Sequence, residues 1–268
     1  MFRSEEGLRP LGDLISLRGK RALITGAAAG IGRAMAHRFA EAGADLHLVD
    51  ISGAGLAGLK EELKGCGVSV EAHVVDLSKK REIDGLWMGI RGEEPDALIN
   101  NAGVYPVRDY LEVDEGFLAK VYNINFNSVF WMCQHMIKAK QEQGGAIVNI
   151  GSIEAVMPFK EGLVHYTTSK AGVIALTRDL AREYGKRFRV NVIVPGGILT
   201  QGTKNVAKDI LKFKVGLIGD AVKFNARLPI GRFGRPDEVA LMALVLSSDL
   251  SSYVNGAVVA VDGGFLSA

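Results

Sequence analysis

Short apolar runs rich in Val, Ile and Leu alternate along this chain with longer stretches that have helical spacing. A strand that is apolar throughout is typical of a parallel sheet, in which helices cover both faces. Strands that alternate with helices therefore predict an α/β fold with a doubly wound, seven-stranded parallel sheet. The predicted strands lie at residues 21–25, 45–50, 70–76, 96–103, 146–152, 189–197 and 257–264.

The chain shows no break in composition and no Ser/Pro-rich linker. We therefore expect one domain over residues 17–268, preceded by an N-terminal extension of residues 1–16. The connection at 198–228 is longer than an ordinary loop and predicts a lid over a substrate site. Six basic side chains against two acidic ones give it a local charge of +4. Such a lid could attract an acidic substrate, although a solvated helix with its apolar side chains inward explains the same pattern.

The composition argues against several kinds of partner. Lys and Arg total 32 against 30 for Asp and Glu, which does not favour nucleic acid or an anionic membrane surface. Residues 1–20 lack the apolar core of a secretion signal, and no run approaches the roughly 20 apolar residues of a membrane helix. Cys66 and Cys133 are too few for a disulfide framework and lack the spacing of a zinc site. We expect a cytoplasmic protein that needs no metal.

A glycine-rich turn follows the first predicted strand. It reads TGAAAGIG, with Gly26, Gly30 and Gly32 in the pattern G-x-x-x-G-x-G. Glycines here let the chain turn tightly and bring backbone N–H groups and a helix N-terminus against a pyrophosphate. By itself the motif is also compatible with a tight turn that binds nothing.

Polar residues end the next strands. Asp50 ends the second strand, where its carboxylate can accept hydrogen bonds from the adenosine ribose and would repel a 2′-phosphate. Ala29 offers no cation to such a phosphate, so both residues favour NAD over NADP. Asp76 can receive the adenine amino group, and NNAG at 100–103 ends the fourth strand at the edge where such sheets bind ligands. A simple turn is the alternative for Asp50 and for the NNAG stretch.

Tyr166 and Lys170 lie four residues apart at the start of a predicted helix, so they project from one face. A phenol has a pKa of about 10, and a nearby ammonium lowers that pKa by favouring the phenolate. The pair therefore predicts a general acid/base that works at neutral pH. Solvated helix surface is the alternative, because most pairs at this spacing are surface pairs.

Ser152 follows the fifth predicted strand and opens onto the same edge, where its hydroxyl can donate to a substrate carbonyl oxygen. A helix or turn cap is the alternative for this residue. Asn125 lies in an apolar helical stretch, in which a buried amide needs a partner. It could hold an ordered water near Lys170, or it could be a satisfied structural amide.

Further motifs complete the series: Pro195-Gly196 with Thr200, and VDGG at 261–264. In order and spacing, the whole set resembles the short-chain dehydrogenase/reductase family in its shorter form, over about residues 17–268. The resemblance implies a Rossmann fold and a homotetramer built from the helices around 114–139 and 163–185 and from the C-terminal strand. Two departures from the family pattern, Gly151 and Ser128, remove no chemical group from the mechanism.

The resemblance implies a role for each matching residue. Lys170 also binds the nicotinamide ribose, and the segment PGGILT holds the nicotinamide carboxamide. The implied catalytic residues are Asn125, Ser152, Tyr166 and Lys170. The implied cofactor-binding residues are Gly26, Ala29, Gly30, Ile31, Gly32, Asp50, Asp76, Leu77, Asn101, Ala102, Gly103, Tyr166, Lys170, Pro195, Gly196, Ile198 and Thr200.

The expected chemistry is hydride transfer to or from the nicotinamide. In the oxidative direction, Tyr166 as phenolate takes the proton of an alcohol held by Ser152 while hydride passes to NAD. The proton then leaves through the ribose hydroxyl, Lys170 and a water on Asn125. No metal takes part in this scheme.

The substrate is less constrained by the sequence. Glu154 could accept hydrogen bonds from the hydroxyls of a sugar or polyol, or it could form a surface salt bridge. The favoured function is an NAD-dependent dehydrogenase that interconverts a sugar, polyol or other small secondary alcohol and its ketone or lactone. The predicted substrate contacts are Ser152, Glu154, Tyr166 and Gly197.

Two other functions stay open. The chain also resembles 3-oxoacyl-carrier-protein reductases, with Arg187 at one of the basic positions that dock the acidic carrier. Gln143 at the other such position and the usual NADPH preference of those enzymes argue against this function. A non-catalytic NAD-binding sensor or scaffold is the second, and retention of all four catalytic residues argues against it.

Overall fold

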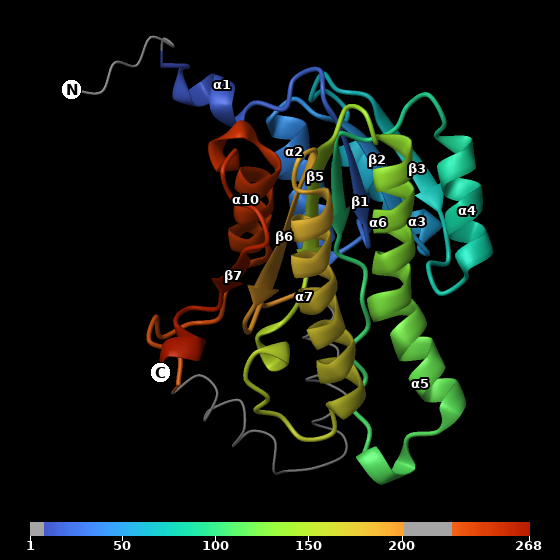
Figure 1. Cartoon of the computed structure of the whole chain (residues 1–268), viewed down its shortest axis with the longest axis vertical. Coiled ribbons are helices and arrows are strands. Elements are labelled where there is room, and N and C mark those ends of the chain that lie inside the picture. The colour runs from blue at the N-terminus through green and yellow to red at the C-terminus, as the bar shows by residue number, and fades with distance from the viewer. Residues whose placement is uncertain (1–7, 201–226) are drawn as a thin grey trace.

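The sheet predicted from the sequence is present in the computed structural model, which describes residues 8–200 and 227–268. Its strands are β1 (Arg21–Thr25), β2 (Asp45–Asp50), β3 (Val70–Val74), β4 (Ala97–Asn100), β5 (Gly145–Ile150), β6 (Phe188–Pro195) and β7 (Val258–Val261). All are parallel and lie in the order β3-β2-β1-β4-β5-β6-β7, so the predicted α/β fold is confirmed (Figure 1). The strand order reverses between β1 and β4, the position where open α/β sheets bind ligands.

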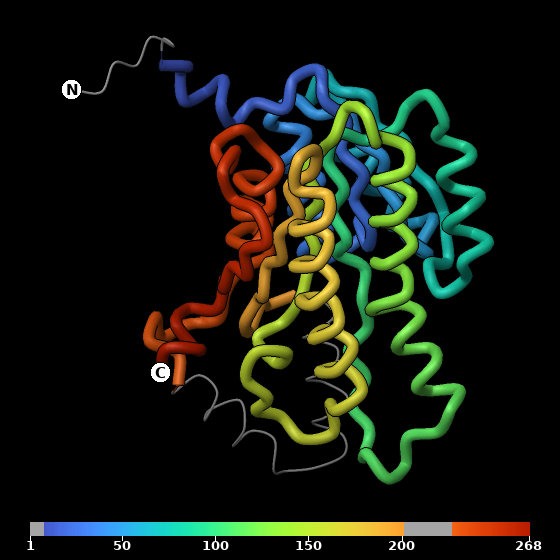
Figure 2. Tube along the Cα trace, in the orientation of Figure 1, coloured from blue at the N-terminus to red at the C-terminus, as the bar shows by residue number. Residues whose placement is uncertain are grey.

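Helices cover both faces of this sheet (Figures 1 and 2). The described helices are α1 (Leu11–Ile15), α2 (Gly30–Glu41), α3 (Gly53–Glu62), α4 (Lys80–Gly89), α5 (Glu115–Tyr122), α6 (Ser128–Ala139), α7 (Val164–Tyr184) and α10 (Pro236–Ser247). One apolar cluster joins α2, α3 and α10 to the sheet, and a second joins α4, α6 and α7 to its other face. None of the described helices combines the length and the apolar composition needed to cross a membrane.

Strand β1 shows why the strands lack polar alternation. Ala22 and Ile24 belong to the first apolar cluster and Leu23 belongs to the second, and all three are buried. The fourth strand is shorter than the predicted run, because it ends at Asn100 rather than at residue 103. Beyond Asn100, the backbone N–H groups of Asn101 and Ala102 donate to the side-chain hydroxyl of Thr25 and no longer to the backbone of a neighbouring strand.

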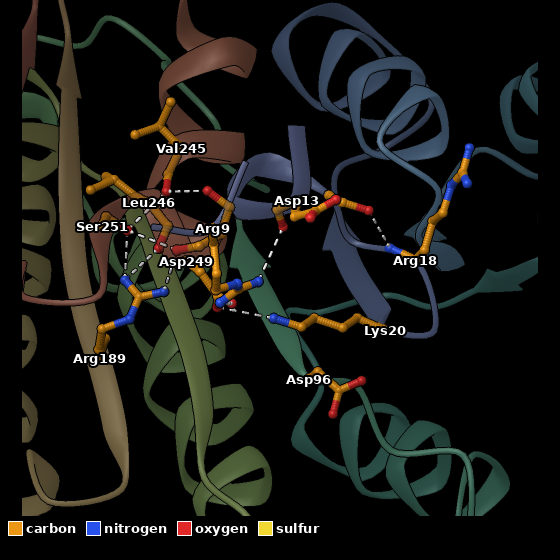
Figure 3. A network of polar contacts seen from close by, with 12 residues as sticks. Arg9, Asp13, Arg18, Lys20, Asp96, Arg189, Val245, Leu246, Asp249 and Ser251 are labelled. Atoms are coloured by element: carbon orange, nitrogen blue, oxygen red, sulfur yellow. Dashed lines mark hydrogen bonds and ion pairs between the residues drawn. The ribbon is translucent and has the colours of Figure 1, made fainter. Parts of the chain in front are cut away.

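The N-terminal extension predicted at 1–16 is described from residue 8. It contains α1 and lies beside the end of α10, away from the carboxyl edge of the sheet (Figure 1). Figure 3 shows Arg9 and Lys20 directed at Asp249, which is in the short 3-10 helix η4 (Asp249–Ser251). The two cations lie 2.8 and 3.2 Å from its carboxylate. These partly exposed pairs position the extension and add little stability.

The predicted lid at 198–228 lies outside the described residues over 201–226. Its first residues are placed by a parallel bridge between Ile198 and Gly234. The backbone N–H of Leu199 donates to the Gly234 carbonyl at 2.9 Å. The lid therefore stays a prediction, with its start fixed beside the end of β6.

Candidate active site

The carboxyl edge of the sheet brings three of the predicted catalytic residues together. Ser152 follows β5, and Tyr166 and Lys170 lie one turn apart on α7. The Tyr166 hydroxyl is hydrogen-bonded to Ser152, and the Ser152 hydroxyl also accepts from the backbone N–H of Glu154 at 3.2 Å. Lys170 is only 3% exposed, so this pair is not solvated helix surface.

The electrostatics of the pair differ from the sequence prediction. Lys170 Nζ donates to the backbone carbonyl of Ile150 at 2.8 Å. Burial raises the pKa of Tyr166 to about 12, the Ser152 hydrogen bond opposes this rise, and the Glu154 charge adds to it. Burial also lowers the pKa of Lys170 to about 8. The predicted lowering of the Tyr166 pKa by Lys170 is therefore wrong for the chain by itself, because burial and the Glu154 charge raise this pKa more than the Ser152 hydrogen bond lowers it.

Asn125 lies beside the pair in a π-helical turn, η2 (Asn123–Asn127), between α5 and α6. Its amide oxygen accepts from the backbone N–H of Val104 at 2.8 Å, and its amide nitrogen donates to the Val104 carbonyl and to Ser169 at 2.9 and 3.3 Å. Its side chain is thus hydrogen-bonded within the protein, as in the second of the two alternatives, a satisfied structural amide. A Cβ on Gly103 would lie 3.3 Å from this amide oxygen and 3.4 Å from Lys170 Nζ, so the three residues meet.

The glycine-rich turn is shaped by close backbone approaches. A Cβ on Gly32 would lie 2.1 Å from the Gly26 carbonyl oxygen, and Gly26 has a φ of +64°. The turn leads into α2, which begins at Gly30 and whose N-cap residue, Ala29, makes no side-chain capping bond. The first N–H groups of a helix have no partner inside it, so this N-terminus can receive an anion. Ile31 and Gly32 belong to this first turn.

The NNAG stretch holds that turn in place. The side-chain nitrogen of Asn101 donates to the backbone carbonyls of Thr25 and Gly26, at 2.9 and 3.1 Å. The Thr25 hydroxyl accepts from the backbone N–H groups of Asn101 and Ala102, at 2.9 and 3.0 Å. The side-chain amide of Asn101 therefore holds the glycine-rich turn that follows β1 against the end of β4. Sequence reasoning did not identify Thr25, whose role depends on a contact between two strands.

Asp50 closes the other side of the turn. Its carboxylate accepts from the backbone N–H of Ala28 at 3.0 Å and from that of Ser52 at 2.9 Å. It is thus both a turn former and an anion fixed beside the glycines. Asp76 accepts from Ser78, and this hydrogen bond lowers the pKa of its carboxyl. These contacts are local to the turn that follows β3, and Leu77 beside Asp76 is buried.

The segment after β6 lies against the glycine-rich turn. A Cβ on Gly196 would lie 2.8 Å from the Asp262 Cα, so Pro195 and Gly196 approach the VDGG motif closely. The Gly197 carbonyl accepts from the backbone N–H of Gly234 at 2.9 Å, and Ile198 is buried. A Cβ on Gly30 would meet the Thr200 methyl group at 3.3 Å. The structure thus brings the predicted nicotinamide segment to the predicted phosphate turn.

A buried polar chain supports this edge from inside the protein. Asn100 donates to Asn149 at 2.8 Å, and Asn149 donates to the Thr177 hydroxyl at 2.9 Å. The chain links β4, β5 and α7 below the reactive side chains. No local pattern predicts this chain of side chains, because the partners come from three elements that are far apart in the sequence.

The fold and the site together define an α/β protein with a nucleotide-type glycine turn beside a buried Ser-Tyr-Lys cluster. The family model described as enoyl-(acyl carrier protein) reductase matches residues 26–266. The 3-oxoacyl-[acyl-carrier-protein] reductase of Thermotoga maritima is 35% identical over 257 residues, 93% of this chain and 99% of that protein. The L-rhamnose-1-dehydrogenase of Scheffersomyces stipitis is 38% identical over 258 residues, 92% of this chain and 96% of that protein. L-Sorbose reductase of Gluconobacter frateurii has a similar structure, with a TM-score of 0.88, 30% identity and coverage of 95% of this chain and 99% of that one.

These matches span nearly the whole chain, and they agree with the resemblance drawn from its motifs. The protein belongs to the short-chain dehydrogenase/reductase family, and it is an oxidoreductase. Its relatives include reductases of acyl-carrier substrates and dehydrogenases of sugars and polyols. Family membership therefore does not define the substrate.

Proposed function

We propose that the protein interconverts a polyhydroxy secondary alcohol, a sugar or polyol, and its ketone or lactone, with NAD as cofactor. The observation that carries the substrate class is the carboxylate of Glu154. This side chain is 2% exposed, and its Oε2 accepts from the backbone N–H of Phe159 at 3.2 Å. Its Oε1 is buried and has no hydrogen-bond partner among the described residues, although the backbone N–H and the charge of Lys160 oppose the burial that raises the pKa of this carboxyl.

An unpaired buried acceptor is costly, so a ligand that donates to Glu154 would be favoured. The carboxylate also lies within electrostatic reach of the reactive centre, because its charge raises the pKa of Tyr166. A hydroxyl next to the reacting carbon of a polyol is a donor of the required kind. A substrate with a single hydroxyl would leave the oxygen unpaired.

The test of this proposal is a panel of polyols and monohydroxy secondary alcohols, read by NADH absorbance. Glu154→Gln keeps the size of the side chain and removes its charge. We expect kcat/KM for the best polyol to fall about tenfold, since a charged hydrogen bond exceeds a neutral one by roughly 1–2 kcal/mol. The exposed neighbour Glu161→Gln is the matched control. Equal losses on both substrate classes would contradict the proposed role of Glu154.

The residues of the chain fit a dinucleotide. The uncapped start of α2 would receive its pyrophosphate, and Asp50 would receive the adenosine ribose hydroxyls. Solved relatives are described with either cofactor, since L-sorbose reductase was complexed with NADPH and 7α-hydroxysteroid dehydrogenase with NADH. The charge of Asp50 is therefore the feature that supports NAD here.

Asp50→Asn removes that charge and keeps one of the two side-chain oxygens that accept hydrogen bonds from the loop. We expect the ratio of kcat/KM for NADP to that for NAD to rise at least about tenfold. The reason is that repulsion between two charges near a protein surface amounts to a few kcal/mol. Steady-state kinetics with both cofactors measure this ratio. Asp45→Asn at the other end of β2 is the control, and a wild-type preference for NADP would refute the cofactor assignment.

The site residues divide the chemistry among them. A bound nicotinamide supplies the hydride chemistry and, when oxidised, a positive charge. Ser152 holds the substrate oxygen, and Tyr166 donates or accepts its proton. With a cofactor bound, the Lys170 ammonium would favour the phenolate, and the amide of Asn125 holds the backbone of Val104. The raised pKa keeps Tyr166 protonated at neutral pH in the chain alone, the form needed for reduction.

A 3-oxoacyl-carrier-protein reductase is the second candidate, supported by the Thermotoga relative and by Arg187. This side chain is exposed, and it donates to the Glu142 carbonyl at 2.7 Å. Rapid NADPH-dependent reduction of a 3-oxoacyl carrier substrate, with weak polyol oxidation, would favour this candidate over the first.

We also propose a homotetramer in the cytoplasm. Leu118 on α5 and Phe130 on α6 are 40% and 38% exposed, which leaves apolar surface on the helices expected at the interface. Sedimentation of the purified protein measures its oligomeric state, and a monomer would refute this part of the proposal.

A further inference from the structure

Three potential metal ligands meet at the edge of the sheet, away from the reactive cluster. His47 lies on β2, and Glu71 and His73 lie on the edge strand β3. In the strand register His47 is opposite Glu71, and His73 is opposite Val49. Residues two apart on a strand share a face, so all three side chains project from the same side of the sheet.

The spacing of the ligand atoms is that of a metal site. His47 Nδ1 lies 3.0 Å from His73 Nε2 and 3.6 Å from Glu71 Oε2, and the last two atoms are 3.8 Å apart. Ligands of tetrahedral Zn²⁺, at about 2.0–2.1 Å from the metal, lie about 3.3–3.4 Å from one another. A small adjustment of the exposed Glu71 side chain would bring the three atoms onto one ion.

The tautomer of His47, inferred from its hydrogen-bond partner, also suits a ligand. Its Nε2 lies 2.9 Å from the backbone carbonyl of Glu93, which can only accept, so Nε2 carries the hydrogen. The lone pair of Nδ1 is then directed at the cluster. A backbone carbonyl that fixes the imidazole in this way is a common second partner of metal-bound histidines.

We propose that His47, Glu71 and His73 bind one divalent transition-metal ion of the Zn²⁺ type. Two imidazole nitrogens and one carboxylate oxygen favour Zn²⁺ over Mg²⁺, which prefers an all-oxygen shell. The side chain of Glu71 is 48% exposed, which leaves an entry path and a position for water. No sequence motif predicts this site, because its ligands come from two strands and lack the short Cys/His spacing of zinc motifs.

The position of the site indicates a structural role. Strands β1 and β4 separate β2 from β5, so about 14 Å, three strand spacings, lie between His47 and the strand that precedes Ser152. The ion would bridge the edge strand β3 to the buried strand β2 and take no part in the reaction. This inference is independent of the proposed function.

The test titrates metal-free full-length protein with Zn²⁺ by calorimetry. We expect one equivalent to bind and to raise the Tm, since an ion that binds only the folded state stabilises it, and Mg²⁺ to do neither. His73→Gln and Glu71→Gln lie on the edge strand, where substitution leaves the core intact. His73→Gln should weaken Zn²⁺ binding at least about 100-fold, because loss of an outer partner alone costs 10–100-fold.

His37 and His135 provide matched controls, because each pairs with a single carboxylate, Glu62 at 3.1 Å and Asp84 at 2.8 Å. His37→Gln and His135→Gln should keep the wild-type affinity. Co²⁺ gives a second readout, because a four-coordinate site with two nitrogen ligands produces intense visible bands that His73→Gln should abolish. Absence of Zn²⁺ binding by the wild type, or unchanged binding by His73→Gln, would overturn the proposal.

Discussion

Tyr166→Phe is expected to lower kcat about 10³-fold while cofactor affinity stays within about threefold. The change removes the hydroxyl that is bonded to Ser152 and leaves the ring, which packs edge-on against Tyr105 with the centroids 4.6 Å apart. Loss of a positioned general acid/base costs 10²–10⁴-fold. Turnover is measured by NADH absorbance, and cofactor affinity by the fluorescence of the bound cofactor.

The neighbouring phenol provides the control for this experiment. Burial raises the pKa of Tyr105 above that of an ordinary tyrosine, and no hydrogen bond to Ser152 opposes the rise. Tyr105→Phe should therefore cost less than about tenfold in kcat. A large loss of kcat for Tyr105→Phe, with near-normal kcat for Tyr166→Phe, would show that Tyr105 is the acid/base and would refute the assignment to Tyr166.

The sequence predicts the fold because the fold depends on short-range patterns. Apolar runs mark strands buried on both faces, and right-handed crossovers between parallel strands place the connecting helices on those faces. Residues that follow those strands, such as Ser152, then meet at one edge by necessity. The partners that approach that edge on one helix face, Tyr166 and Lys170, are predictable for the same reason.

What the sequence did not predict depends on contacts between distant segments. The direction of the Lys170 ammonium is set by the Ile150 carbonyl, and the amide of Asn125 is taken up by the backbone of Val104. The pKa of Tyr166 follows from burial, which no local spacing encodes. The pairing of His47 with His73 likewise needs the register of β2 against β3.

Lys170→Met is expected to lower kcat/KM at least about 10²-fold and yet to make the protein more stable at pH 7. Removal of one preorganised electrostatic contact in an active site costs 10²–10³-fold. Stability should rise because the ammonium is buried and pairs with no carboxylate among the described residues, so that burial lowers its pKa from 10.5 to about 8. A pKa shift of that size corresponds to about 3 kcal/mol of lost folding stability, which the variant regains. Loss of the hydrogen bond to the Ile150 carbonyl offsets roughly 1–2 kcal/mol of this gain.

The pH dependence separates this explanation from simple repacking. Below about pH 8 both the folded and the unfolded protein carry the Lys170 proton, so the full cost of the buried charge is present. Between about 8 and 10.5 only the unfolded chain stays protonated, and the stability contributed by this group rises with pH. The advantage of Lys170→Met should therefore be largest below pH 8 and vanish toward pH 10.5, whereas Lys186→Met on the surface should change little. Urea denaturation across this range measures the effect, and a variant less stable than wild type at every pH would show that the buried ammonium is not a source of instability.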